Sequence, residues 1–203
     1  MGQRKLRLLG ISGSPRAAAT DWAVREALRY AEETYAVETA YFSVMKKKIA
    51  FCIHCDHCIL KREGCIFTDS MEEVYELMQW ADAYIIGSPV YQGNISGQLK
   101  TLFDRTRAIL AIDINVFEGK VGSGIAIGGD RMGGQEPTLR TIHDFYILNH
   151  IFSVGGGAFG ANLGATFWSK DKGAAGVEAD KQGIKSLHRT IDRLMAVAFK
   201  LNK

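Results

Sequence analysis

The cysteines are the feature that most constrains this chain. All four lie in one short stretch with the pattern C-x2-C-x2-C-x6-C, at Cys52, Cys55, Cys58 and Cys65. Two-residue gaps let successive thiolates turn toward one centre, and the longer last gap lets the loop close over it. Runs that bind [4Fe–4S] clusters in bacterial ferredoxins are similarly compact, although their last gap is shorter and a proline follows. The pattern therefore favours a [4Fe–4S] cluster on a loop over residues 45–68.

Two other interpretations use the same four cysteines. A structural zinc ion with four thiolate ligands is less favoured, because such sites more often use two separated C-x2-C pairs. Unligated or disulfide-bonded cysteines are less favoured, because this spacing gives small, strained loops and the rest of the chain is typical of an intracellular protein. Since four thiolates are available as metal ligands, His54 and His57 are interpreted as loop residues.

Length and composition predict one globular domain. The chain has 203 residues, of which 47% are apolar, enough to bury a full core in a single domain over residues 1–203. A net charge of +3 is too small to indicate nucleic-acid binding. No run of 18 apolar residues predicts a membrane span, and the N-terminal residues lack the apolar region of a secretory signal. We therefore expect a cytoplasmic protein with reduced thiols.

Apolar segments alternate with helical patterns along the chain. The expected strands are residues 6–11, 37–44, 83–87, 121–127 and 151–154. A helical pattern from Ile184 to Ala198 closes the sequence, whereas residues 155–176 hold seven glycines without periodicity and are expected to form an ordered loop. The alternation predicts an α/β fold with a doubly wound, five-stranded parallel sheet and the cysteine loop after strand 2. Ligands bind at the carboxyl ends of the strands in this architecture.

A hydroxyl-rich loop, Ser12–Thr20, follows the first expected strand. Thr20 is a suitable N-cap for the helix that comes next. Backbone N–H groups, the helix dipole and the hydroxyls can all favour an anion here, so the loop predicts phosphate binding; a simple capped turn is the alternative. The loop contains neither the P-loop Gly-Lys-Ser/Thr sequence nor the G-x-G-x-x-G dinucleotide fingerprint.

Two further loops follow the third and fourth expected strands. Ser88–Asn94 is rich in turn residues, and Gly128–Glu136 is glycine-rich and opens onto a helix. Because the carboxyl ends of parallel strands meet at one edge of a sheet, the three loops should converge. Backbone groups of the second and third loops, with the face of Tyr91, are suited to a planar ring. Together the loops indicate an FMN site.

Several short motifs resemble those of a known family. They are Gly13-Ser14-Pro15-Arg16 with Thr20, Ala81-Asp82-Ala83, Ser88-Pro89-Val90-Tyr91, Leu99-Lys100 and Asp104-Arg105. These motifs resemble the flavodoxin-like NADPH-dependent FMN reductases. The compact cysteine motif before Asp69-Ser70-Met71 narrows the resemblance to the iron–sulfur flavoproteins. One departure is Ala17-Ala18-Ala19, where relatives often carry polar residues or glycine.

The resemblance implies a flavodoxin-like fold with one [4Fe–4S] cluster and one FMN per chain, in homodimers or homotetramers. It implies electron transfer from a ferredoxin-like donor to a small acceptor such as O2, H2O2 or a quinone. The implied cluster ligands are Cys52, Cys55, Cys58 and Cys65. The implied FMN contacts are Ser12, Ser14, Pro15, Arg16, Thr20, Pro89, Val90, Tyr91, Gln92, Gly93, Asn94, Gly128, Gly129, Asp130 and Arg131. We expect no side chain to act as a general base, because the cofactors carry the redox chemistry.

Two other functions are consistent with the same residues. One is an NAD(P)H-dependent flavin or quinone reductase whose metal site is only structural. The other is a non-catalytic electron carrier or redox sensor.

Overall fold

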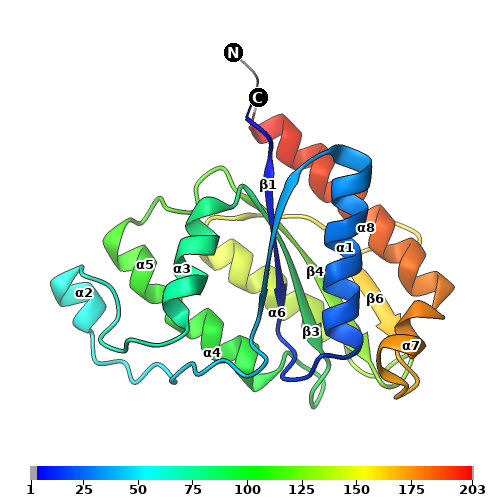
Figure 1. Cartoon of the computed structure of the whole chain (residues 1–203), viewed down its shortest axis with the longest axis horizontal. Coiled ribbons are helices and arrows are strands. Elements are labelled where there is room, and N and C mark those ends of the chain that lie inside the picture. Colours follow the sequence, from blue (N-terminus) through cyan, green and yellow to red (C-terminus); the bar gives the residue numbers. More distant parts are fainter. Residues whose placement is uncertain (1–3, 203) are drawn as a thin grey trace.

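A parallel β-sheet runs through the middle of the molecule, with helices on both sides (Figure 1). The computed structural model describes residues 4–202, so residues 1–3 and 203 of the expected domain lie outside the described residues. The strands are β1 (Arg7–Ser12), β2 (Glu38–Ser43), β3 (Ala83–Pro89), β4 (Val121–Gly128), β5 (Phe152–Ser153) and β6 (Ala165–Trp168). Their order is β2-β1-β3-β4-β5, and β6 also pairs with β4. This order confirms the doubly wound α/β prediction.

The helices divide into two groups that cover opposite faces of the sheet. Helices α1 (Ala19–Tyr35), α7 (Gly173–Glu178) and α8 (Lys181–Leu201) cover one face, and α3 (Met71–Trp80), α4 (Gly97–Arg105), α5 (Arg107–Ile112) and α6 (Gln135–Leu148) the other. The short α2 (His57–Lys61) lies in the cysteine loop. In β1, Leu8 packs toward the first group and Leu9 toward the second, so the strand is buried on both faces as its apolar sequence predicts. Within residues 4–202, no helix combines the length and apolarity needed to cross a membrane.

The glycine-rich segment over residues 155–176 is not the loop expected from the sequence, because it contains β6 and α7. The short β5 pairs with Val121 and Gly122, and β6 pairs with the second half of β4, from Ile125 to Gly128. The fifth position of the sheet is thus shared by two short strands that residues 154–164 separate.

The third strand is longer than expected, because β3 continues through Ser88 to Pro89. Ser88 pairs with Ala126 of β4, and the N–H of Val90 donates to the carbonyl of Ile127 at 2.9 Å. Pairing with β4 therefore outweighs the turn preference of Ser88 and Pro89. Proline can occupy this position because pairing with β1 ends at Gly87, so the side of the strand on which Pro89 lacks an N–H has no partner strand. As a result, the loop after β3 begins at Val90.

Candidate functional site

The loop after β1 is fixed by contacts with β3 and α4. The N–H of Gly13 donates to the carbonyl of Gly87 at 2.7 Å, and its own carbonyl accepts from Ser96 Oγ at 2.5 Å. A Cβ at Gly13 would lie 2.8 Å from the side chain of Leu99, so only glycine allows this close approach. The backbone of the loop is therefore positioned by elements that are distant in the sequence.

The N-terminus of α1 has no side-chain cap among the described residues. The expected N-cap role of Thr20 is wrong: the helix begins at Ala19, Ala18 takes the cap position, and Thr20 is buried in the first turn. Ser14 does not cap the helix either, because its Oγ accepts from the N–H of Arg16 at 3.1 Å and donates to its carbonyl at 3.0 Å. The free N–H groups of this helix end are available to an anion.

Ser12 has a buried hydroxyl without a partner near this helix end. The residue is fully buried at the end of β1, and its Oγ has no hydrogen-bond partner among the described residues. A buried hydroxyl without a partner is unfavourable, so unpaired groups of this kind are rare in folded proteins. Together with the uncapped helix, this hydroxyl fits the phosphate end of a flavin mononucleotide.

A cavity of about 220 Å³ opens at the carboxyl edge of the sheet. Its wall combines the loop after β1, the loop after β3, the end of β4 and the segment after β6. The lining residues are Ser14, Arg16, Ala18, Ala19, Thr20, Pro89, Val90, Tyr91, Ile127, Gly129, Ser169, Asp171 and Gly173. The structure therefore brings the three sequence-predicted loops together and adds a fourth segment.

The other expected flavin contacts lie in these loops or at the strand ends that precede them, outside the cavity wall. They are Ser12, Pro15, Gln92, Gly93, Asn94, Gly128, Asp130 and Arg131. Gln92 and Gly93 form a tight turn with φ values of 49° and 77°, closed by the N–H of Tyr91 and the carbonyl of Asn94 at 2.8 Å. Asn94 Oδ1 accepts from Thr141 Oγ1 of α6 at 2.7 Å, so the turn is tied to that helix.

The loop after β4 is held by the buried Gln135. Its Nε2 donates to the carbonyl of Asp130 at 2.7 Å, and its Oε1 accepts from the N–H of Gly133 at 2.9 Å. The guanidinium of Arg131 lies 4.7 Å from the ring centre of Trp168, and the amine of Lys170 lies 4.6 Å from it. Two cations therefore flank an aromatic ring beside the cavity.

The segment after β6 is part of the site that the sequence did not predict. Ser169 donates to the carbonyl of Gly128 through its N–H at 2.9 Å and its Oγ at 3.1 Å, which joins the segment to β4. Lys170 and Asp171 have φ values of 51° and 54°, unusual for residues other than glycine. The sequence signal for β6 is the alternation of residues that favour burial along Ala165–Trp168. A segment of four residues is too short to stand out among the glycines around it.

The four cysteines lie on the loop after β2, as expected. Cys52 and Cys55 are exposed, Cys58 and Cys65 are half-buried, and all four are free thiols. Within residues 4–202, no group of three Cys, His, Asp or Glu side chains is arranged to hold a metal ion. The donor set thus suits an iron–sulfur cluster, but the structure does not gather it.

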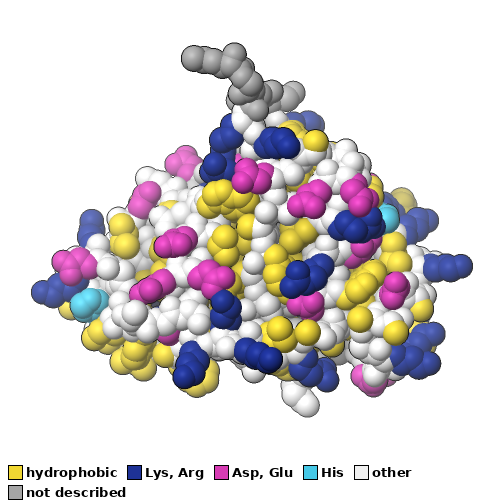
Figure 2. Space-filling model, in the orientation of Figure 1, with side chains coloured by type: hydrophobic (Ala, Val, Ile, Leu, Met, Phe, Trp, Pro, Cys, Tyr) yellow, Lys and Arg dark blue, Asp and Glu magenta, His cyan; other side chains and the backbone are white. Residues whose placement is uncertain are grey.

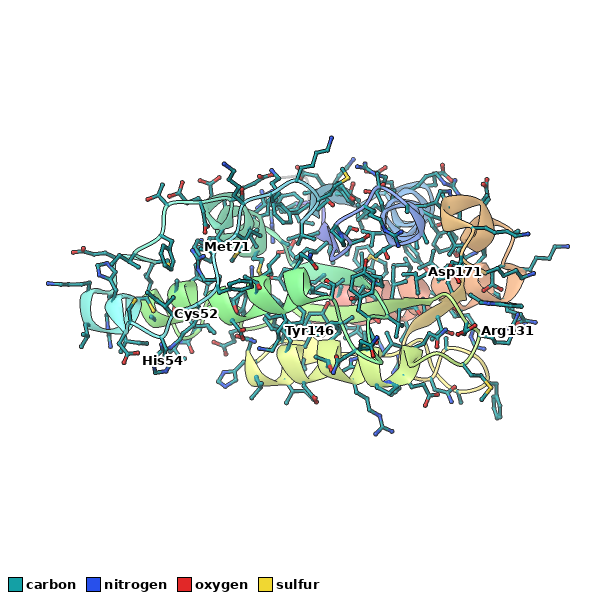
Figure 3. All side chains as sticks on the ribbon, turned by 90° about the horizontal axis from the view of Figure 1, so that it is seen from below. Cys52, His54, Met71, Arg131, Tyr146 and Asp171 are labelled. Atoms are coloured by element: carbon teal, nitrogen blue, oxygen red, sulfur yellow. The ribbon has the colours of Figure 1, made fainter. Side chains whose placement is uncertain are left out.

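The cysteine loop and the cavity lie at different ends of the carboxyl edge. Figure 3, which shows the molecule from below, places Cys52 and His54 at one end and Arg131 and Asp171 at the other. The loop also exposes large apolar side chains: Phe51, Ile53, Leu60 and Ile66. Figure 2 shows apolar side chains along the lower left edge, where Figure 1 places this loop.

Comparisons with known proteins extend over nearly the whole chain. A family model described as NADPH-dependent FMN reductase matches residues 6–166. An iron–sulfur flavoprotein of Methanocaldococcus jannaschii is 61% identical over 192 residues, covering 95% of this chain and 96% of the relative. One of Archaeoglobus fulgidus is 47% identical over 194 residues, covering 96% and 98%.

Among solved structures, a WrbA-like flavodoxin from Agrobacterium tumefaciens has a TM-score of 0.67 at 16% identity, covering 97% of this chain and 98% of that one. A flavodoxin from the domain Archaea has a TM-score of 0.57 at 13% identity, covering 98% and 100%. These likenesses confirm the flavodoxin-like fold. The sequence matches confirm the resemblance found in the motifs: the chain belongs to the NADPH-dependent FMN reductase family and, within it, to the iron–sulfur flavoproteins.

Proposed function

We propose that this chain is an oxidoreductase that holds FMN at the carboxyl-edge cavity and a [4Fe–4S] cluster on the cysteine loop. It would accept electrons from a ferredoxin-like donor and reduce a small acceptor such as O2, H2O2 or a quinone. One observation carries the proposal: a cavity suited to an anion and a loop with four free thiols lie on the same edge of the sheet. When bound, the cluster supplies one-electron and the flavin one- or two-electron chemistry.

The proposed flavin site assigns the phosphate to the N-terminus of α1. Free N–H groups there, with the hydroxyl of Thr20, would satisfy the anion, and the exposed Arg16 would balance its charge. The cavity of about 220 Å³ is smaller than the roughly 300–1,000 Å³ of a typical ligand pocket. It suits the phosphate and sugar chain, so the ring would lie at the mouth, between Tyr91 and Gly129.

The proposed cluster ligands are the four cysteines. Because they are free thiols on an exposed loop, cluster insertion requires the loop to bring the four sulfurs together. The basic run Lys46-Lys47-Lys48 at the start of the loop supports an acidic electron donor. Lys46, Lys47 and Lys48 are all exposed, and Lys47 pairs with Glu73. Such charges steer association and lose their effect as salt concentration rises.

Anaerobic purification tests this proposal directly. We expect an absorption spectrum with both flavin and iron–sulfur bands, and iron, sulfide and FMN in a ratio of about 4:4:1 per chain. One zinc ion per chain without sulfide would contradict the cluster. A protein without flavin after supply of FMN would contradict the cavity assignment.

The cations beside the cavity favour a second candidate function. Arg131 and Lys170 flank Trp168, an arrangement that could take the phosphate and base of a dinucleotide, and the matching family is described as NADPH-dependent. In that case NADPH would reduce the flavin directly, with a colourless structural metal in the cysteine loop. Stopped-flow reduction by NADPH of a Cys58→Ser variant distinguishes the two candidate functions, because only the NADPH-dependent reductase predicts full activity without the cluster.

A non-catalytic electron carrier would exchange electrons quickly with a partner but turn over no acceptor.

A further inference from the structure

A buried ion pair joins the end of α4 to the chain just after the last cysteine. The side chain of Arg105 is 1% exposed and that of Asp69 11%. Arg105 Nη1 donates to Asp69 Oδ2 at 2.8 Å, and Nη2 lies 3.3 Å from Oδ1. The guanidinium also lies 5.2 Å from the ring centre of Phe67. A planar two-pronged donor matches a carboxylate in this way, and lysine cannot reproduce it.

The same pair also holds the chain just before the first cysteine. Arg105 Nη1 donates to the carbonyl of Ala50 at 2.7 Å, and the N–H of Ala50 donates to Asp69 Oδ2 at 2.9 Å. Asp69 Oδ1 accepts from the N–H of Met71 at 3.0 Å. Ala50 and Asp69 flank Cys52–Cys65, so one ion pair closes the base of the whole cysteine loop.

Beyond its base, the loop contacts the body of the protein where α2 lies against α5. Helix α2 contains no buried residue, and Phe51 and Leu60 are 76% and 77% exposed. A second arginine, Arg107, donates to Asp56 Oδ1 at 2.6 Å. Both side chains of this pair are more than one-third exposed, so the pair contributes little to the stability of the loop. The buried polar contacts that hold the loop therefore lie at its base.

Arg105 also has one donor left. Its Nε is buried without a partner among the described residues, and Phe67, whose ring centre lies 5.2 Å from the guanidinium, follows Cys65 by two residues. A buried N–H group without an acceptor is unfavourable. The sulfur of a metal-bound cysteine can serve as an acceptor, and hydrogen bonds to such sulfurs tune iron–sulfur clusters.

We propose that Arg105 is a positioning residue for the iron–sulfur cluster. Through Asp69 and Ala50 it closes the base of the cysteine loop before the cluster is bound, and its free Nε–H donates to the Cys65 sulfur once the cluster is in place. The first role concerns the loop itself, and the second rests on the proposed cluster.

Hydrogen exchange of the full-length, FMN-supplied chain before iron and sulfide are added tests the first role. The reporting amides are those of Ala50 and Met71, which donate to Asp69, and that of Ser70, which donates to the carbonyl of Lys48 at 3.1 Å. In Arg105→Met these amides should exchange about 100-fold faster, because breaking one side of a buried ion pair leaves the other charge uncompensated. Amides of β1 should not change.

Three further variants make the result specific. Arg105→Lys keeps the charge and should restore part of the protection, whereas a role in packing alone predicts the same result for Lys and Met. The double variant Arg105→Met with Asp69→Asn removes the uncompensated carboxylate, so it should fold and still lose protection at the three amides. Arg107→Met is the matched control and should exchange like the wild type. Wild-type protection in both Arg105→Met and the double variant would overturn the role of Arg105 in closing the loop.

Reconstitution with iron and sulfide tests the second role. Arg105→Lys should bind iron with a shifted electron paramagnetic resonance spectrum of the reduced cluster, while Arg107→Met should match the wild type. Identical spectra for Arg105→Lys and the wild type would overturn the hydrogen bond to Cys65. A wild-type chain that binds no iron under these conditions would refute the proposed cluster and the hydrogen bond, and the exchange result would still decide the loop-closing role.

Discussion

At the scale of single residues, the phosphate assignment depends on Thr20. Its side chain is 2% exposed, lines the cavity and stands in the uncapped first turn of α1. Thr20→Val keeps the shape but removes the hydroxyl, so FMN binding should weaken by roughly 1.5–3 kcal/mol, the value of one hydrogen bond to a charged group. Riboflavin binding should change much less, because riboflavin lacks the phosphate. Flavin fluorescence titrations measure both affinities.

Thr34→Val is the matched control, because Thr34 is exposed near the other end of the same helix. Its FMN affinity should equal that of the wild type. Equal losses of FMN and riboflavin affinity in Thr20→Val would show that the hydroxyl supports the cavity and does not contact the phosphate.

The carboxyl group of Asp69 makes acid stability a second test at this scale. Burial opposes its ionisation, but hydrogen bonds from Arg105 and from the N–H groups of Ala50 and Met71 outweigh it, so the pKa of Asp69 lies below the ordinary value of 3.8. Because the folded-state pKa is lowered, Asp69 stabilises the fold above about pH 4 and this contribution is lost as the pH falls through the folded-state pKa.

Urea unfolding at a series of pH values measures this effect. The free energy of unfolding of the wild type should fall as the pH drops from about 4 to 2, and Asp69→Asn should show a shallower fall. Asp104→Asn serves as control, since Asp104 is 46% exposed in its pair with Lys100. Parallel curves for Asp69→Asn and the wild type would contradict the lowered pKa.

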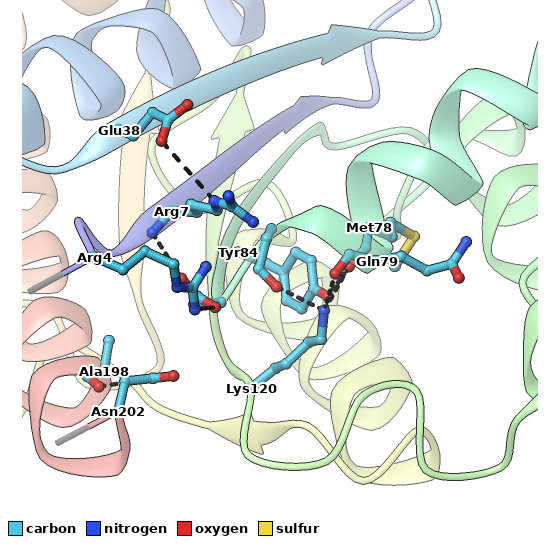
Figure 4. A network of polar contacts seen from close by, with 11 residues as sticks. Arg4, Arg7, Glu38, Met78, Gln79, Tyr84, Lys120, Ala198 and Asn202 are labelled. Carbon is cyan, nitrogen blue, oxygen red and sulfur yellow. Dashed lines mark hydrogen bonds and ion pairs between the residues drawn. The ribbon is translucent and has the colours of Figure 1, made fainter.

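At the scale of elements, Lys120 joins the start of β4 to the end of α3. Its Nζ donates to the carbonyls of Met78, Gln79 and Ala81 at 2.9, 2.7 and 2.6 Å (Figure 4). These carbonyls belong to the helix end, where no further intrahelical N–H is available, and a cation is favoured there. Lys120→Met should therefore lower the free energy of unfolding by about 1–3 kcal/mol.

Chemical unfolding followed by circular dichroism measures the change. Lys100→Met is the control, because the Lys100 side chain is 56% exposed and its pair with Asp104 should contribute little. A Lys120→Met variant as stable as the wild type would mean that water replaces the amine at these carbonyls.

The elements also show what the sequence could predict. Strands such as β1 and β4 are continuous apolar runs, and α8 has a clear helical period, so each is visible locally. By contrast, β6 has four residues between glycine-rich segments, and it exists because it pairs with Ile125–Gly128. Because Ser169–Gly173 follows β6, one wall of the cavity could not be predicted either. Contacts between distant segments decide such elements, and local preferences do not reveal them.

At the scale of the whole molecule, the prediction of three converging loops was correct because it follows from topology. Any parallel sheet in the order found here places the ends of β1, β3 and β4 side by side. The same reasoning placed the cysteine loop on this edge beyond β2. It could not show that the described residues do not gather the sulfurs into a metal site, or that Arg105 on α4 contacts the base of the loop, since neither depends on strand order.

The exposed apolar side chains of the cysteine loop bear on the homodimer or homotetramer that the family resemblance implies. Phe51, Ile53, Leu60 and Ile66 are each more than half exposed, which is costly for side chains of this size on one short segment. A symmetric pair of chains would bury the same residues twice with one self-complementary interface. It would also cover the loop that carries the cysteines.

Analytical ultracentrifugation of charged variants tests this assembly. Leu60→Glu places a charge in the expected interface and should shift the protein toward monomer, with a dissociation constant raised at least about tenfold, because removing one central apolar anchor commonly costs more than 1 kcal/mol. Phe159→Glu is the control: Phe159 is 95% exposed but lies between β5 and β6, away from the cysteine loop, and should leave association unchanged. If Leu60→Glu associates as strongly as the wild type while Phe159→Glu does not, the interface involves the segment between β5 and β6 instead of the cysteine loop.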